Sequence, residues 1–288
     1  MKNDPIQAKL ADLGTVDAAT ADGRNQLAKA LADRSSLVVK KAARMAGEAR
    51  ITELLPYLRK AFDRILPKAA EIDKGCAALT AIVGALVELD YDEPEPFLAG
   101  IRHVQMEPVW GGSVDTAPDL RAACAVGLIN TRHPRMLEEL TTLLADREWR
   151  ARVGAIRALA TTGADAAFLL LRYKALIGDE ERDVLFECFS ALIAADESAS
   201  IPLVSARMDS ASDEIVEAAI LALGTARHKW AFEALQRKLK QPRLGPIRRT
   251  ILLAMASMRL DEAVAFVKDL AKGEDKEAED VLHELQIT

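Results

Sequence analysis

Apolar residues recur three and four positions apart along most of this chain, which is the pattern of amphipathic helices. The segments "RVGAIRALATTG" (152–163) and "VEAAILALGTA" (216–226) show it clearly, and both are rich in small residues that let helices pack closely. A short turn and a second amphipathic segment follow, as in "AFLLLRYKAL" (167–176). The pattern therefore predicts pairs of helices.

These helix pairs repeat along the sequence. One late apolar residue can be taken from the first helix of each pair, which gives seven anchors: Ala46, Leu86, Leu128, Leu159, Leu192, Leu223 and Met255. The last four intervals between anchors are 31 to 33 residues, whereas the first two are 40 and 42. A single helix pair cannot bury its apolar face, but stacked neighbours can. We predict an all-α solenoid of about seven two-helix repeats.

The repeats suggest one domain over residues 1–288. Residues 1–26 are expected to form an N-terminal helical cap, residues 27–274 the repeats, and residues 275–288 a C-terminal capping helix. In that last helix Val281, Leu282 and Leu285 are expected to cover the final apolar face. The long early intervals point to an irregular insertion around residues 90–119.

Composition supports helices and a protein of the cytoplasm. Aromatic residues make up only 5%, and a net charge of −6 is unfavourable for binding nucleic acid. The longest apolar run, residues 77–87, is too short to cross a membrane, and no apolar leader follows Met1. Three widely spaced cysteines without a CxxC pair fit a reducing compartment.

The repeat resembles the HEAT repeat, in particular the short bacterial form named after the phycobilisome (PBS) lyases. That unit carries an acidic residue before its first helix, then an arginine and small apolar residues. The best match in this chain is Asp146, Arg152, Ala155, Ala158 and Leu159. The resemblance covers roughly residues 27–274 and implies an armadillo-like helical fold, but it implies no particular activity, because such repeats serve many purposes.

No residue presents itself for catalysis, for a metal or for a cofactor. His133 and His228 fall on equivalent turns three repeats apart, too far from each other to share a metal ion. Cys124 and Cys188 align with buried alanines of first helices, and Cys76 is expected to be more exposed. The common nucleotide-binding, zinc-protease and hydrolase motifs do not occur in the sequence.

An alternative is a HEAT-like protein that binds nucleic acid or acts as an enzyme. The chain faintly resembles the alkylpurine DNA glycosylases of this fold, through Trp110, Asp115 and the segment 148–159. Its densest basic stretch holds a candidate secondary patch of Arg237, Lys238 and Lys240. A bilin-lyase role rests on the name of the repeat alone.

The segment "MEPVWGGSVDTAPDLRAAC" (106–124) interrupts the repeats, and we expect residues 107–118 to form an ordered loop without strands. Trp110 either fills a gap between repeats or anchors a partner, and burial is the expectation because an exposed indole is unfavourable without a partner. Insertions in solenoids often form the binding face. The candidate binding site therefore consists of Arg102, His103, Glu107, Trp110 and Asp115.

Taken together, the sequence favours a non-catalytic scaffold or adaptor that binds another protein, with no membrane and no nucleic acid as partner.

Overall fold

The computed structural model describes residues 5–242 and 244–287 and divides into two compact units, the first ending at Ala158 and the second beginning at Leu159. Helix α10 (Trp149–Thr162) runs across this boundary in the chain. Residues 1–4 of the expected N-terminal cap and residue 288 of the expected C-terminal cap lie outside the described residues. The single domain over residues 1–288 stays a prediction.

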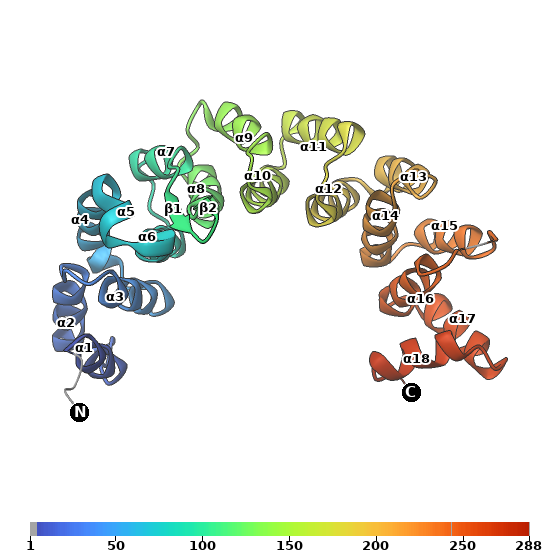
Figure 1. Cartoon of the computed structure of the whole chain (residues 1–288), viewed down its shortest axis with the longest axis horizontal. Helices are drawn as coiled ribbons and strands as arrows, with labels where there is room; N and C mark the ends of the chain where they lie inside the picture. Colours follow the sequence, from blue (N-terminus) through green and yellow to red (C-terminus); the bar gives the residue numbers. More distant parts are fainter. Residues whose placement is uncertain (1–4, 243, 288) are drawn as a thin grey trace. The chain divides into compact units, whose positions relative to one another are not determined.

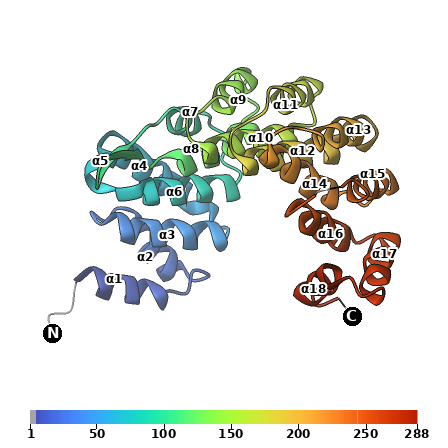
Figure 2. The ribbon, with the colours of Figure 1, turned by 45° about the vertical axis from the view of Figure 1, so that its right-hand side comes forward.

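The first unit is built from pairs of helices. The first helices α3, α6 and α8 lie side by side in one layer (Figure 2), with α4 packed against α6 and α7 against α8. Their order along the chain is α1 (Pro5–Gly14), α2 (Ala21–Leu31), α3 (Ser36–Glu48), α4 (Leu55–Ile65), α5 (Ala69–Ile72), α6 (Ala77–Glu88), α7 (Glu95–Ile101), α8 (Pro118–Asn130) and α9 (Met136–Leu144). Short 3₁₀ turns occur at Thr52–Leu54, Leu66–Lys68 and Lys74–Cys76.

The second unit repeats the same arrangement with greater regularity. The first helices α12, α14 and α16 pack in succession, and α13 and α15 pack against them (Figure 1). The elements are α11 (Asp165–Ile177), α12 (Arg182–Ala195), α13 (Glu197–Arg207), α14 (Asp213–Thr225), α15 (Lys229–Leu239), α16 (Ile247–Ser257), α17 (Asp261–Lys272) and α18 (Lys276–Glu284).

The predicted all-α repeat fold is confirmed. Each of the seven anchors lies in the first helix of a pair, and none is more than 1% exposed. Phe62, Phe97 and Phe189 are among the largest fully buried side chains. The apolar spacing therefore marks the faces along which neighbouring repeats bury each other.

Polar side chains set where several helices begin. Ser212 accepts a hydrogen bond from the Ile215 amide at 3.4 Å and caps α14. Thr20 and Asp196 cap α2 and α13 in the same way. Such caps satisfy amide groups that have no partner within the helix.

Two glycines mark places where elements approach too closely for a side chain. A methyl group added to Gly127 in α8 would lie 2.2 Å from the ring of Phe97 in α7, and one added to Gly224 in α14 would lie 2.9 Å from the Cβ of Ala254 in α16. Small residues in the first helices therefore permit the close stacking of the repeats.

The insertion differs from its expected form. Residues 106–115 form an antiparallel hairpin of β1 (Met106–Val109) and β2 (Gly112–Asp115), so the prediction of a loop without strands is wrong here. Met106 pairs with Asp115 and Val109 with Gly112, which leaves Trp110 and Gly111 as a two-residue turn. Gly111 has φ = 89°, a conformation that glycine adopts without strain. The β-branched valines of the segment suit strands.

At the other end of the chain, α18 packs against α16 and α17. Asp275 caps it by accepting a hydrogen bond from the Ala278 amide at 3.2 Å, and Val281 is fully buried. Leu282 and Leu285 are half-buried. These contacts are those that a closing helix requires, and its capping role stays a prediction.

We predict that Gly127→Ala lowers the free energy of unfolding by about 1–3 kcal/mol, because the added methyl group overlaps the buried Phe97 ring. Gly84→Ala is the matched control, since it also lies within a helix but has open space around its Cβ position. That control should be neutral or more stable by about 0.5–1 kcal/mol. Urea denaturation measures both, and equal stabilities of the two variants would contradict this packing.

Candidate functional site

The structure brings the five predicted site residues to one part of the first unit, in and beside the hairpin between α7 and α8 (Figure 1). Arg102 and His103 end α7 and begin the approach to β1, Glu107 lies in β1, and Asp115 ends β2. Trp110 occupies the tip. Arg102 and Trp110 are exposed, whereas Glu107 and Asp115 form hydrogen bonds within the chain.

Trp110 is exposed over its whole surface, at 103% of the reference value, so the expectation that it fills a gap between repeats is wrong. Other large apolar side chains of the hairpin and its approach are also about half exposed: Val104, Met106, Val109 and Val114. Exposed apolar groups gathered on one element mark a surface that a partner can cover. Trp110 is the largest of them.

Gln105 lies beneath the hairpin and is only 2% exposed. Its amide nitrogen donates to the backbone oxygen of Asp73 at 2.9 Å and to the Glu107 carboxylate at 2.6 Å. Its amide oxygen accepts from the Cys76 thiol at 3.1 Å and lies 3.3 Å from Nε2 of His103. One buried amide thus joins the base of the hairpin to the segment that precedes α6.

Glu107 strengthens the same connection. Its carboxylate accepts hydrogen bonds from the Gly75 amide at 2.7 Å and from the Thr116 hydroxyl at 2.9 Å, as well as from Gln105. The Gly75 amide is the main reason that the pKa of Glu107 lies below its ordinary value. This carboxylate is therefore ionised and holds the hairpin in place.

Arg121 of α8 forms the second attachment and is 3% exposed. Its guanidinium donates to Asp115 at 2.7 Å, to both oxygens of Asp146 at 2.8 and 2.9 Å, and to the His103 backbone oxygen at 2.9 Å. It therefore joins the end of β2, the end of α7 and the turn before α10. Removal of one partner from such a buried group leaves the others without compensation.

The charges in this cluster stabilise one another. Burial alone acts to raise the pKa of Asp115, but hydrogen bonds from the Ala117 and Gln105 amides and from Arg121 outweigh it, so the pKa is lowered. Burial likewise opposes the charge on Arg121, yet its two carboxylate partners raise the pKa of the guanidinium. Asp115 and Arg121 are thus both suited to remain charged.

Arg102 has a separate partner. It follows α7 as its C-cap, is exposed, and forms a two-pronged ion pair with Glu139 of α9, in which its Nε lies 3.1 Å from Oε2. The Arg102 guanidinium holds the pKa of Glu139 below its ordinary value. Arg102 therefore links two second helices, and it contributes less to the hairpin than the sequence suggested.

The cysteines are all free and buried, so the expectation that Cys76 is more exposed is wrong. Burial raises the pKa of Cys76 and of Cys188 to about 12, and it raises the pKa of Cys124 as well. Thiols of this kind are protonated near neutral pH and are weak nucleophiles. The buried carboxylate of Asp73, whose pKa burial raises, accepts hydrogen bonds from the Ala78 and Leu79 amides in the first turn of α6.

The predicted basic patch lies in the second unit, on the last turn and C-cap of α15. Lys238 is paired with Asp209 at 3.3 Å, whereas Arg237 and Lys240 are exposed. Further along the same basic stretch, Arg248 pairs with Asp275 and Glu277, and Arg249 pairs with Glu284. Much of the positive charge seen in the sequence is therefore neutralised locally.

His133 and His228 lie before second helices, and each Nδ1 accepts a hydrogen bond from the backbone amide two residues later.

Within residues 5–242 and 244–287, no group of three His, Cys, Asp or Glu side chains is arranged to hold a metal ion. In that same part of the chain, every helix is too short or too polar to span a bilayer.

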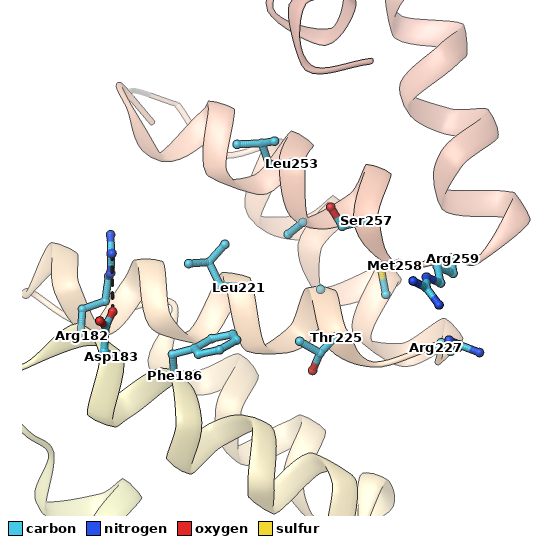
Figure 3. Close-up of a pocket in the computed structure, with 12 residues that line it drawn as sticks. Arg182, Asp183, Phe186, Leu221, Thr225, Arg227, Leu253, Ser257, Met258 and Arg259 are labelled. Carbon is cyan, nitrogen blue, oxygen red and sulfur yellow. Dashed lines mark ion pairs between the residues drawn. The ribbon is translucent and has the colours of Figure 1, made fainter. Parts of the chain in front are cut away.

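Sequence reasoning missed a groove in the second unit, which has a volume of about 640 Å³ and is lined by residues of α12, α14 and α16 and of the turns after α14 and α16 (Figure 3). Its members are far apart in the sequence and each resembles an ordinary position of its repeat. Equivalent positions in adjacent repeats were the available signal, because such positions lie side by side in a solenoid.

We predict that Arg121→Met lowers the free energy of unfolding by about 3–5 kcal/mol, because it leaves Asp115 and Asp146 buried without a counter-charge. Arg135→Ala removes an exposed arginine from an ion pair with Glu138, whose side chain is also exposed, and should cost less than about 1 kcal/mol. Chemical denaturation of the two variants gives the comparison. Similar losses in both would show that the buried cluster is not the principal attachment.

Comparison of this chain with known proteins gives similarities to solved structures alone, at low TM-scores. No family model matches it, and no curated protein matches it. Among solved structures it is similar to human deoxyhypusine hydroxylase, with 17% identity, a TM-score of 0.34, and coverage of 89% of this chain and 91% of that one. It is also similar to the CpcE–CpcF complex of phycocyanin lyase from a Nostoc species, with 17% identity, a TM-score of 0.36, and coverage of 90% and 92%.

Proposed function

We propose that this protein is a non-catalytic interaction module, an adaptor or scaffold, that binds a protein partner through the hairpin at residues 106–115. Trp110 is the anchor of this surface. The observation that carries the proposal is the contrast between a fully exposed indole and a hairpin base held by buried polar groups. Tryptophan is strongly enriched among the residues that dominate binding energy at protein interfaces.

The attachment of the hairpin matters for affinity. Gln105, Glu107 and Asp115 fix both strands to neighbouring helices before any partner arrives. A surface that is already ordered loses less conformational entropy on binding. The exposed side chains of Met106, Val109 and Val114 offer apolar contacts around the indole. This combination supports recognition of a protein surface.

The polar residues of the site support positioning rather than chemistry. Glu107 and Asp115 are used in holding the hairpin, and Cys76 is buried with a raised pKa. Three free, buried cysteines are typical of a protein that works in a reducing cytoplasm. The alternatives, a nucleic-acid-binding protein or an enzyme similar to alkylpurine DNA glycosylases or bilin lyases, receive less support, since the basic residues Lys238, Arg248 and Arg249 are paired with carboxylates.

We predict that Trp110→Ala abolishes partner binding and leaves the melting temperature within about 2 °C of the wild type, because the indole makes few contacts within the chain. A photoreactive amino acid at Ser113, which is exposed beside the tip, records binding directly in extract from the source organism. The crosslinked partner is identified by mass spectrometry, and the Trp110→Ala version should give no crosslink to it.

Trp230→Ala is the matched control. Trp230 is also exposed, at 52%, but it lies on α15 against His228, away from the hairpin in the sequence. This variant should crosslink as strongly as the wild type. A partner that Trp110→Ala still captures at full yield refutes the hairpin as the binding site, and a crosslink only to nucleic acid favours the alternative function.

A further inference from the structure

The groove in the second unit has an apolar floor formed by one side chain from each of three consecutive first helices. These are Phe186 of α12, Leu221 of α14 and Leu253 of α16, all half-buried, and Figure 3 shows them facing a common space. The groove holds about 640 Å³. Apolar side chains left partly open in this way mark a surface that can receive another apolar group.

Two adjacent repeats contribute the same three kinds of side-chain group to this groove. Leu221, Thr225 and Arg227 supply an apolar group, a hydroxyl and a guanidinium at the end of α14. One repeat later, Leu253, Ser257 and Arg259 supply the same groups at the same spacing at the end of α16. Because equivalent positions of adjacent repeats are neighbours, the two sets form one composite surface.

The two ends of the groove differ in charge. At one end Arg182 is compensated by Glu217 at 3.2 Å and by Asp183 at 3.6 Å. At the other end lie Arg227 and Arg259 (Figure 3), both exposed, and neither forms an ion pair with a carboxylate in the described part of the chain. A helix C-terminus favours one cation nearby. Two uncompensated guanidinium groups beside an apolar floor also provide a site for a carboxylate.

We propose that this groove binds an acidic amphipathic helix of a partner protein, with its apolar face on Phe186, Leu221 and Leu253 and its carboxylates at Arg227 and Arg259. The proposal concerns the second unit and does not depend on the function of the hairpin. The helical elements that line the groove and the spacing of its floor residues determine which kind of segment can occupy it.

The lining elements determine the backbone form of the occupant. The groove is built from α-helices and their C-terminal turns, so it offers no open strand edge to an extended peptide. A helical peptide satisfies its own backbone hydrogen bonds and needs only side-chain contacts. Apolar anchors at i, i+3 or i+4, and i+7 are the usual way in which a helix occupies an apolar groove.

The spacing of the floor residues fits the same occupant. Packed helices lie about 8–10 Å apart, so the three floor residues extend over roughly 16–20 Å. A helix rises 1.5 Å per residue, so anchors seven residues apart are about 10 Å apart, and three anchors at i, i+7 and i+14 span about 21 Å. One apolar anchor of the peptide can therefore meet each successive helix.

Selection from a displayed library of random 16-residue peptides against the full-length chain tests the proposal. Enriched peptides should combine apolar residues at helical spacing with Asp or Glu near one end. Fluorescence anisotropy of labelled copies should show roughly 10- to 100-fold weaker binding to the double variant Arg227→Glu/Arg259→Glu, and weaker binding to the wild type as salt rises.

The double variant Arg237→Glu/Lys240→Glu makes the same charge change on α15, outside the groove, and should bind the peptides as the wild type does. Circular dichroism and melting temperature check that both variants fold. Absence of enrichment, enriched peptides without acidic residues, or equal binding to the Arg227→Glu/Arg259→Glu variant would overturn the proposal. Binding of decanoate at the groove without any peptide binding would assign it to small carboxylates instead.

Discussion

The candidate site depends on the ion pairs that the guanidinium of Arg121 forms with Asp115 and Asp146. This guanidinium is nearly inaccessible to solvent, and it lies between the carboxylates of Asp115 and Asp146. Asp146 lies in the turn before α10 and Arg121 lies within α8, so their ion pair joins these two parts of the repeats. The same guanidinium also donates a hydrogen bond to Asp115 of the hairpin. The inserted segment is therefore attached to the repeats through a side chain that already joins them.

This attachment separates the hairpin into a fixed base and an exposed tip. Gln105 and Glu107 join the base to the segment before α6, while Trp110 has no comparable contact with the described residues and is fully exposed. Burial of polar groups at the base is favourable only because each has a partner. At the tip, by contrast, the apolar side chain of Trp110 is exposed to water, and a bound partner would cover it. The hairpin therefore presents an apolar tip on an ordered base, and the proposed binding role rests on this arrangement.

The fold could be predicted from the sequence because the apolar anchors, from Ala46 to Met255, recur at helical positions in every repeat. The hairpin could not, since Pro108, Gly111 and Gly112 are typical of loops, and its strands are held by Asp73 and Gly75, which lie about thirty residues earlier. The sequence placed the candidate residues in one segment, but it did not predict the exposure of Trp110, because exposure depends on what lies around the side chain. The groove was missed because its residues meet only across adjacent repeats.

Backbone order in the hairpin tests the central claim most directly. Amide ¹⁵N relaxation of the full-length, deuterated protein gives order parameters for residues 106–115, with proline excepted. A hairpin held by Arg121, Gln105 and Glu107 should show values near 0.85 in the strands, comparable to those of the flanking helices. Arg121→Met should lower them. Values below about 0.6 in the unaltered protein would contradict the account, because Trp110 would then lie on a flexible loop.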